Sequence, residues 1–199
     1  MKKIELTDIK NILDYERERE EFRDRIIQAK KNRRIAVGDV ITLVFENRET
    51  VLFQIQEMVR AERIIDPAKI QDEIDVYNEL LPGPGELSAT LFIEISDSSE
   101  IKPTLQRLLG LARPGTVLME IGPNHHIDAQ IDGGREEEAA GRLSAVQYVK
   151  FHLGPEASET FLTTDAPVFL VIDHPNYKAR VQITGNLLAS LRSDLDRSH

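Results

Sequence analysis

The sequence predicts an α+β fold: a mainly antiparallel sheet with N-terminal helices, two central helices and a C-terminal helix. Three observations support this prediction. Apolar residues recur at helical spacing near both ends of the chain, and β-branched runs fill much of the sequence between them. The connections between those runs are mostly short, which favours an antiparallel sheet. At 199 residues, the chain is long enough to bury a core of its own.

The N-terminal part predicts helices. The pair Thr7-Asp8 offers a helix N-cap, and two apolar sets at helical spacing follow it, at 9–13 and at 22–27. A fully charged stretch separates the two sets. This pattern indicates two helices, or one helix whose middle is solvated, and we favour two helices with a break near Glu18.

Charge is distributed unevenly along the chain. Residues 1–34 hold 11 bases against 8 acids, whereas residues 35–199 hold 14 against 26, so the net charge is −9. This acidic remainder repels phosphate backbones and argues against nucleic-acid binding. The absence of cysteine excludes disulfides, iron–sulfur ligation and thiol nucleophiles. With no apolar run of membrane-spanning length and no signal peptide at the start, we expect a soluble cytoplasmic protein.

The middle of the chain predicts a hairpin followed by two helices: strands at 34–37 and 40–45, helices at 49–65 and 66–81. Gly38-Asp39 supplies a two-residue hairpin turn. Asp66-Pro67 is typical of a helix start. That second helix ends at the Pro-Gly-Pro-Gly sequence of residues 82–85, which cannot continue it.

The second half predicts strands with intervening helices: strands at 87–95, 116–121, 127–131, 144–153, 168–172 and 177–183, and helices at 98–109, 155–163 and 187–195. The strand at 127–131 continues its predecessor across a turn, and the strand at 177–183 is either the partner or the continuation of the one before it. Residues 132–141 predict a mobile loop. We expect one domain over 1–199, with a basic helical arm at 1–34 and an acidic α+β body at 35–199.

Four segments, at 53–64, 70–82, 144–151 and 173–177, resemble in sequence and in order an uncharacterised bacterial family, catalogued as domain of unknown function 3501 (DUF3501). The resemblance brings no established activity. It implies a redox or oxidative-stress context, since the family is associated with gene neighbourhoods that encode rubrerythrin-like and iron–sulfur oxidoreductase proteins. We expect such proteins as partners, a homodimer, and no cofactor.

The polar residues of the helix at 49–65 form the first candidate site: Gln56, Glu57, Arg60, Glu62 and Arg63. Gln56, Arg60 and Arg63 share one helix face, since they stand at i, i+4 and i+7. Both signs of charge beside an apolar stripe predict a polar pocket or a subunit interface. The alternative is a solvated helix face with intrahelical ion pairs.

Asp173, His174 and Tyr177 form the second candidate site, directly after a strongly apolar strand. A distant carboxylate such as Glu57 could orient His174 as a general base. The alternative is a turn in which Pro175 fixes the backbone and Tyr177 packs back on the core.

Metal binding would fall to His125, His126 and His174, with Asp128 or Asp173 as a carboxylate ligand. Adjacent residues on a strand point to opposite faces, so His125 and His126 can share a metal only inside a turn. No ligand pair stands at helical spacing. The sequence therefore does not predict a metal site.

Three functions stay open. The first is a non-catalytic accessory or binding protein that works beside redox proteins and contacts them through the helix at 49–65. The second is an enzyme or ligand sensor whose polar pocket combines Glu57, Arg60 and His174. The third is a histidine–carboxylate metal-binding protein. We prefer the first because it requires no catalytic or metal-ligand motif, and the sequence shows none.

Overall fold

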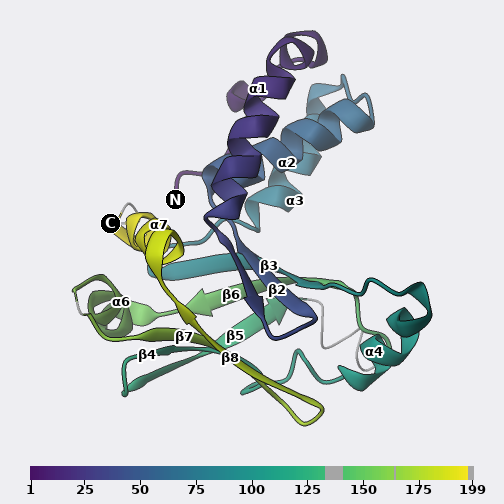
Figure 1. The fold of residues 1–199 in the computed structure, drawn as a ribbon. Helices are drawn as coiled ribbons and strands as arrows, with labels where there is room; N and C mark the ends of the chain where they lie inside the picture. The colour runs from purple at the N-terminus through teal and green to yellow at the C-terminus, as the bar shows by residue number, and fades with distance from the viewer. Residues whose placement is uncertain (133–140, 164, 197–199) are drawn as a thin grey trace.

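A computed structural model describes residues 1–132, 141–163 and 165–196, and within them one eight-stranded antiparallel sheet dominates the fold (Figure 1). The strands are β1 (Arg34–Val37), β2 (Ile41–Phe45), β3 (Glu86–Ile93), β4 (Val117–Ile121), β5 (His125–Asp132), β6 (Val146–His152), β7 (Val168–His174) and β8 (Tyr177–Ile183). Their order in the sheet is β1-β2-β3-β6-β5-β4-β7-β8, and every pairing is antiparallel. The predicted α+β class is confirmed.

Helices lie on one side and at both ends of this sheet (Figure 1). They are α1 (Ile12–Lys31), α2 (Arg48–Ala61), α3 (Pro67–Asn78), α4 (Ile101–Arg107), α6 (Gly154–Thr163) and α7 (Gly185–Asp196), with short 3-10 turns at Leu6–Asp8 and Ser98–Glu100. Figure 1 shows α1, α2 and α3 together above the sheet, α6 and α7 at one end and α4 at the other. Most of the predicted mobile loop, residues 133–140, lies outside the described residues.

The sheet curls until its two outer strands, β1 and β8, approach each other. At this seam the Tyr177 hydroxyl donates a hydrogen bond to the Val37 carbonyl at 2.7 Å. Gly38, in the predicted hairpin turn, has φ +81°, and a Cβ there would stand 2.2 Å from the Tyr177 oxygen. The turn therefore needs glycine for its backbone conformation and for the approach of Tyr177. The predicted hairpin at 34–45 is confirmed.

The main core lies inside the curled sheet, and β2 is buried on both of its faces. Ile41, Leu43 and Phe45 point into the core, since alternate residues of a strand share a face. Further along the chain, β5 turns back and pairs antiparallel with β4 instead of continuing it. Likewise, β8 is the antiparallel partner of β7.

The N-terminal segment, α2 and α3 share a separate core, formed by Ile4, Val51, Ile55, Val59, Ile74 and Leu81. The predicted break near Glu18 is wrong, because α1 runs without interruption and its N-cap is Asn11 rather than Thr7-Asp8. The charged middle of α1 finds partners on other segments: Glu16 with Arg60 at 2.6 Å, and Glu18 with Lys10. Charges that pair across a helix contact do not mark a helix end.

Candidate functional site

The polar face of α2, the first candidate site, lies against α1. The Glu57 carboxylate accepts hydrogen bonds from the Tyr15 hydroxyl at 2.6 Å and from two nitrogens of Arg19, each at 2.8 Å. The Arg19 hydrogen bonds lower the pKa of Glu57, while partial burial opposes that shift. Burial and the bond to Glu57 raise the pKa of Tyr15. Glu57 is therefore ionised and joins α2 to α1.

The neighbouring residues serve the same contact or end the helix. The Gln56 amide exchanges two 2.9 Å hydrogen bonds with the backbone of Lys10. Glu62 is the C-cap of α2, and Arg63 follows it in the left-handed region with φ 53°. The five predicted residues thus divide between a packing contact, made by Gln56, Glu57 and Arg60, and a helix terminus.

His174 is buried at the end of β7, and backbone groups engage both of its ring nitrogens. The Asn176 N–H donates to Nδ1 at 3.1 Å, so Nε2 carries the proton and donates to the Leu109 carbonyl at 2.9 Å. Asp173 pairs with Lys178 on the adjacent strand. Tyr177 closes the sheet seam. These contacts match the turn interpretation of residues 173–177.

The structure does not bring His174 together with Glu57 and Arg60. The partners of Glu57 and Arg60 come from α1, whereas those of His174 come from its own hairpin and from Leu109. Figure 1 shows α2 above the sheet and the β7–β8 hairpin at its lower edge. The polar pocket expected from these three residues is not assembled.

The histidines considered as metal ligands also have separate surroundings. The His125 Nε2 lies 3.1 Å from the Thr160 hydroxyl, and the His126 Nδ1 lies 3.7 Å from a Glu120 oxygen. Within the described ranges, no group of three or more His, Cys, Asp or Glu side chains converges on a common point. His125, His126 and His174 therefore do not fit a shared metal centre.

The structure instead assembles a hollow of about 460 Å³ where the N-terminal segment, α1, the start of α2 and the end of α7 meet. We call it the N-terminal hollow. Phe22 and Leu52 give it an apolar part, and a narrower hollow of about 180 Å³ shares both of these residues. The volume lies within the range of small-molecule sites, roughly 300–1,000 Å³.

Basic side chains line the N-terminal hollow: Lys2, Arg25 and Arg48. Arg48 is the first residue of α2, where Asn47 caps the helix by accepting a 3.0 Å hydrogen bond from the Thr50 N–H. One Arg48 nitrogen donates to Asp8 at 2.6 Å. The pKa of Asp8 is lowered, first by a backbone hydrogen bond and then by Arg48.

The Nε of Arg48 is buried without a hydrogen-bond partner, one of two such side-chain atoms in the part of the chain that the structure describes. Most buried polar atoms in proteins have a partner, so each exception calls for an explanation. A buried N–H that no acceptor meets costs about 1–3 kcal/mol. Arg48 is thus the group at this hollow whose hydrogen-bonding capacity the fold leaves unused.

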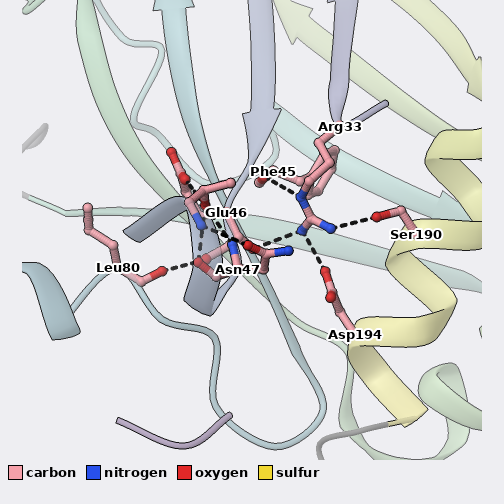
Figure 2. Close-up of polar contacts among 9 residues, drawn as sticks. Arg33, Phe45, Glu46, Asn47, Leu80, Ser190 and Asp194 are labelled. Atoms are coloured by element: carbon pink, nitrogen blue, oxygen red, sulfur yellow. Dashed lines mark hydrogen bonds and ion pairs between the residues drawn. The ribbon is translucent and has the colours of Figure 1, made fainter. Parts of the chain in front are cut away.

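A buried network fixes one wall of the hollow (Figure 2). The Arg33 guanidinium donates to the carbonyls of Phe45 at 2.8 Å and Glu46 at 3.0 Å. From the other side, as Figure 2 shows, α7 presents Ser190 at 2.6 Å and Asp194 at 2.5 Å. Arg33 therefore ties α7 to the start of the helical layer and holds Asp194 at the hollow.

The Glu46 carboxylate is buried next to this network and accepts only from neutral donors among its hydrogen bonds in the described structure. These donors are the hydroxyls of Thr50 at 2.5 Å and Thr90 at 2.7 Å, and the Gln54 amide at 3.1 Å. Sequence reasoning missed Arg33, Glu46 and Arg48. A signal was available for two of them, because Arg33 and Glu46 are charged residues directly before and after the apolar hairpin at 34–45.

Comparisons with known proteins give a family but no activity. The family model described as "Protein of unknown function (DUF3501)" matches residues 3–195. No curated protein matches the sequence. A 1.90 Å crystal structure, described as a novel protein of unknown function from Burkholderia pseudomallei K96243, is 30% identical, with a TM-score of 0.89. The match covers 98% of this chain and 100% of that one. Over the described residues, no helix has the length and apolar character of a membrane span.

Proposed function

Because the chain belongs to the DUF3501 family, described as proteins of unknown function, we propose a function from the geometry: it is a non-catalytic binding protein whose N-terminal hollow holds a small organic anion. The ligand class is a carboxylate or phosphate ester with an apolar group. Arg48 carries the proposal, since this residue lines the hollow and its buried Nε has no partner.

The charges at the hollow support an anion. The protein has a net charge of −9, yet Lys2, Arg25 and Arg48 all line this one site. The two carboxylates in the lining, Glu49 and Asp194, are already paired with Arg25 and Arg33. An anion bound here would accept from Arg48, one of three basic side chains that line the hollow against two carboxylates.

The apolar lining supports an organic group on that anion. Phe22 packs edge-on against Phe53, with ring centroids 5.4 Å apart, so its ring is held in place beside the hollow. Leu52 stands next to it on α2. A ligand with a ring or short alkyl chain would cover both side chains and add the favourable free energy of apolar burial.

Binding is better supported than catalysis by the contacts of the residues that could act as acid or base. Glu57 is ionised and occupied by Tyr15 and Arg19, and both nitrogens of His174 are occupied by backbone groups. Part of the α2 face expected to contact a partner packs against α1 and the segment before it, through Gln56, Glu57 and Arg60. We therefore move the proposed binding site from that face to the adjacent N-terminal hollow.

The cellular setting is also a proposal. We propose that the protein acts in the cytoplasm as a homodimer, beside rubrerythrin-like or iron–sulfur oxidoreductase partners, as a sensor or carrier of the anion. The family resemblance supports those partners. Sedimentation velocity tests the dimer, and co-purification from the native host tests the partners.

Isothermal titration calorimetry with phenyl phosphate tests the anion site. We expect phenyl phosphate to bind more tightly than inorganic phosphate or benzyl alcohol, because only it carries both the charge and the ring. Its affinity falls with rising salt, as for any partly exposed ion pair. Arg48→Gln weakens binding by about tenfold or more, since a hydrogen bond to a charged group is lost.

Arg34→Gln is the matched control. Arg34 pairs with Glu94 in an exposed contact, does not line the hollow, and loses the same charge when substituted. Phenyl phosphate affinity should be unchanged in this variant. If Arg48→Gln folds as the parent does and binds phenyl phosphate equally well, the proposed site is wrong.

A further inference from the structure

A second hollow, of about 380 Å³, lies between residues 82–85 and α6, and shares no lining residue with the N-terminal hollow. Its lining is mainly apolar and includes Pro84, Pro155 and Leu162. The backbone N–H of Leu153 donates to the Gly85 carbonyl at 2.9 Å, which fixes the loop against the start of α6. We call this the α6 hollow.

Ser158 lines the α6 hollow and is the other residue with a buried, unpartnered side-chain atom in the described structure. Its side chain differs from the other hydroxyls of α6. Thr160 donates to the Glu156 carbonyl at 3.0 Å and Thr163 to the Glu159 carbonyl at 2.7 Å, the usual bond back to the preceding turn. Ser158 makes no such bond, although it is 4% exposed. Its hydroxyl therefore has unused hydrogen-bonding capacity, and a ligand that reached it would supply the missing partner.

Gly85 lies next to that hydroxyl and adds no side chain to the hollow. A Cβ on Gly85 would stand 3.5 Å from the Ser158 oxygen and 3.9 Å from the Gly154 backbone nitrogen. The first N–H groups of a helix have no acceptor within the helix, and Gly154 begins α6. The Ser158 hydroxyl and the Gly154 amide therefore lie at the same end of the hollow, next to Gly85.

We propose that the α6 hollow binds a small, neutral, apolar molecule through a carbonyl oxygen. The oxygen accepts from the Ser158 hydroxyl and the Gly154 N–H, and the apolar part covers Pro84, Pro155 and Leu162. The ligand is neutral because Glu159 lines the hollow and the whole chain is acidic, so a second carboxylate would be repelled.

Amide-resolved NMR with cyclohexanone as the probe tests this proposal, and cyclohexanecarboxylate is the anionic comparison. We expect cyclohexanone to shift the amide signals of Gly154 and Ser158, and to bind more tightly than the carboxylate. Ser158→Ala removes the hydroxyl and keeps the shape, so affinity for cyclohexanone falls by about fivefold to tenfold. The same variant should melt no lower than the parent, because the lost hydroxyl bonds to nothing in the fold.

Thr160→Ala is the control, since it deletes a hydroxyl of the same helix that does not line the hollow. Its cyclohexanone affinity should match the parent. Equal affinity in Ser158→Ala, tighter binding of the carboxylate, or no shift at the start of α6 each overturns the proposal. Amide shifts at the hollow that depend on protein concentration in the absence of cyclohexanone would also overturn it, since they would show that a second copy of the chain occupies the hollow. Phenyl phosphate binding at the N-terminal hollow is independent of all these results.

Discussion

At the scale of single residues, the ion pair between Arg33 and Asp194 is the one whose loss should cost most. Its two side chains are 3% and 8% exposed. Asp194→Ala would leave the Arg33 guanidinium buried without its counter-charge. We expect the free energy of unfolding, measured by urea denaturation, to fall by about 3–5 kcal/mol.

Arg17→Ala provides the comparison, because Arg17 pairs with Asp14 on the surface, where the two side chains are 77% and 52% exposed. The loss should be no more than about 1 kcal/mol, since water and salt screen exposed pairs. An Asp194→Ala protein as stable as Arg17→Ala would show that the buried pair contributes little.

These residues also show which parts of a site can be predicted from a sequence. The turn at residues 173–177 is local, and its interpretation as a turn agrees with the structure. Arg33 and Asp194 stand 161 residues apart, so no window of sequence contains both partners. The polar positions on α2 were predicted as a site from their spacing on one helix, whereas the contacts that they make depend on α1 facing them. The N-terminal hollow could not be predicted for the same reason.

At the scale of elements, strand and turn patterns predicted more than charge patterns did. The hairpin of β1 and β2 follows from two β-branched runs and a glycine turn, both of which are short-range. The break expected in α1 was wrong because a charged stretch does not by itself end a helix. Its side chains can lie in solvent, or they can pair with another helix. In this protein Glu16 pairs with Arg60, which lies 44 residues later in the chain and on another helix.

The contact between α1 and α2 should weaken in acid because of Glu57. Its pKa is lowered below the ordinary 4.5, chiefly by the Arg19 hydrogen bonds, so the unfolded chain binds more protons as pH falls. The stability that this carboxylate adds is complete above pH 4.5 and is lost as pH falls through the lowered folded-state pKa. The Glu57→Gln variant has no carboxylate at this position, so it does not lose this stability as pH falls.

Urea denaturation of the parent and of Glu57→Gln over a series of pH values measures the effect. We expect the parent to be more stable at neutral pH, and the difference to shrink as pH falls below 4.5. Other carboxylates titrate equally in both proteins and cancel in the difference. A difference that stays constant with pH would mean that the Glu57 charge does not hold the two helices together.

At the scale of the whole molecule, the helical layer and the curled sheet share buried groups. The Glu46 carboxylate joins Thr50 of α2 to Thr90 of β3. Next to it, the Ser88 hydroxyl of β3 donates to the Leu80 carbonyl after α3 at 2.6 Å. Separate unfolding of the helices would leave these polar groups, and the outer face of β2, without partners. The free energy of each layer therefore depends on the other.

We accordingly expect the helical layer and the sheet to unfold in one transition. The chain has no tryptophan, so a single one introduced in each layer reports on that layer alone. Phe53→Trp on α2 and Phe169→Trp on β7 replace partly buried rings. In each variant, the urea midpoint measured by tryptophan fluorescence should equal the midpoint measured by far-UV circular dichroism, as two-state unfolding requires. In the Phe53→Trp protein, a lower midpoint by fluorescence than by circular dichroism would mean that α1, α2 and α3 unfold first, and that the buried contacts of Glu46 do not couple the two layers.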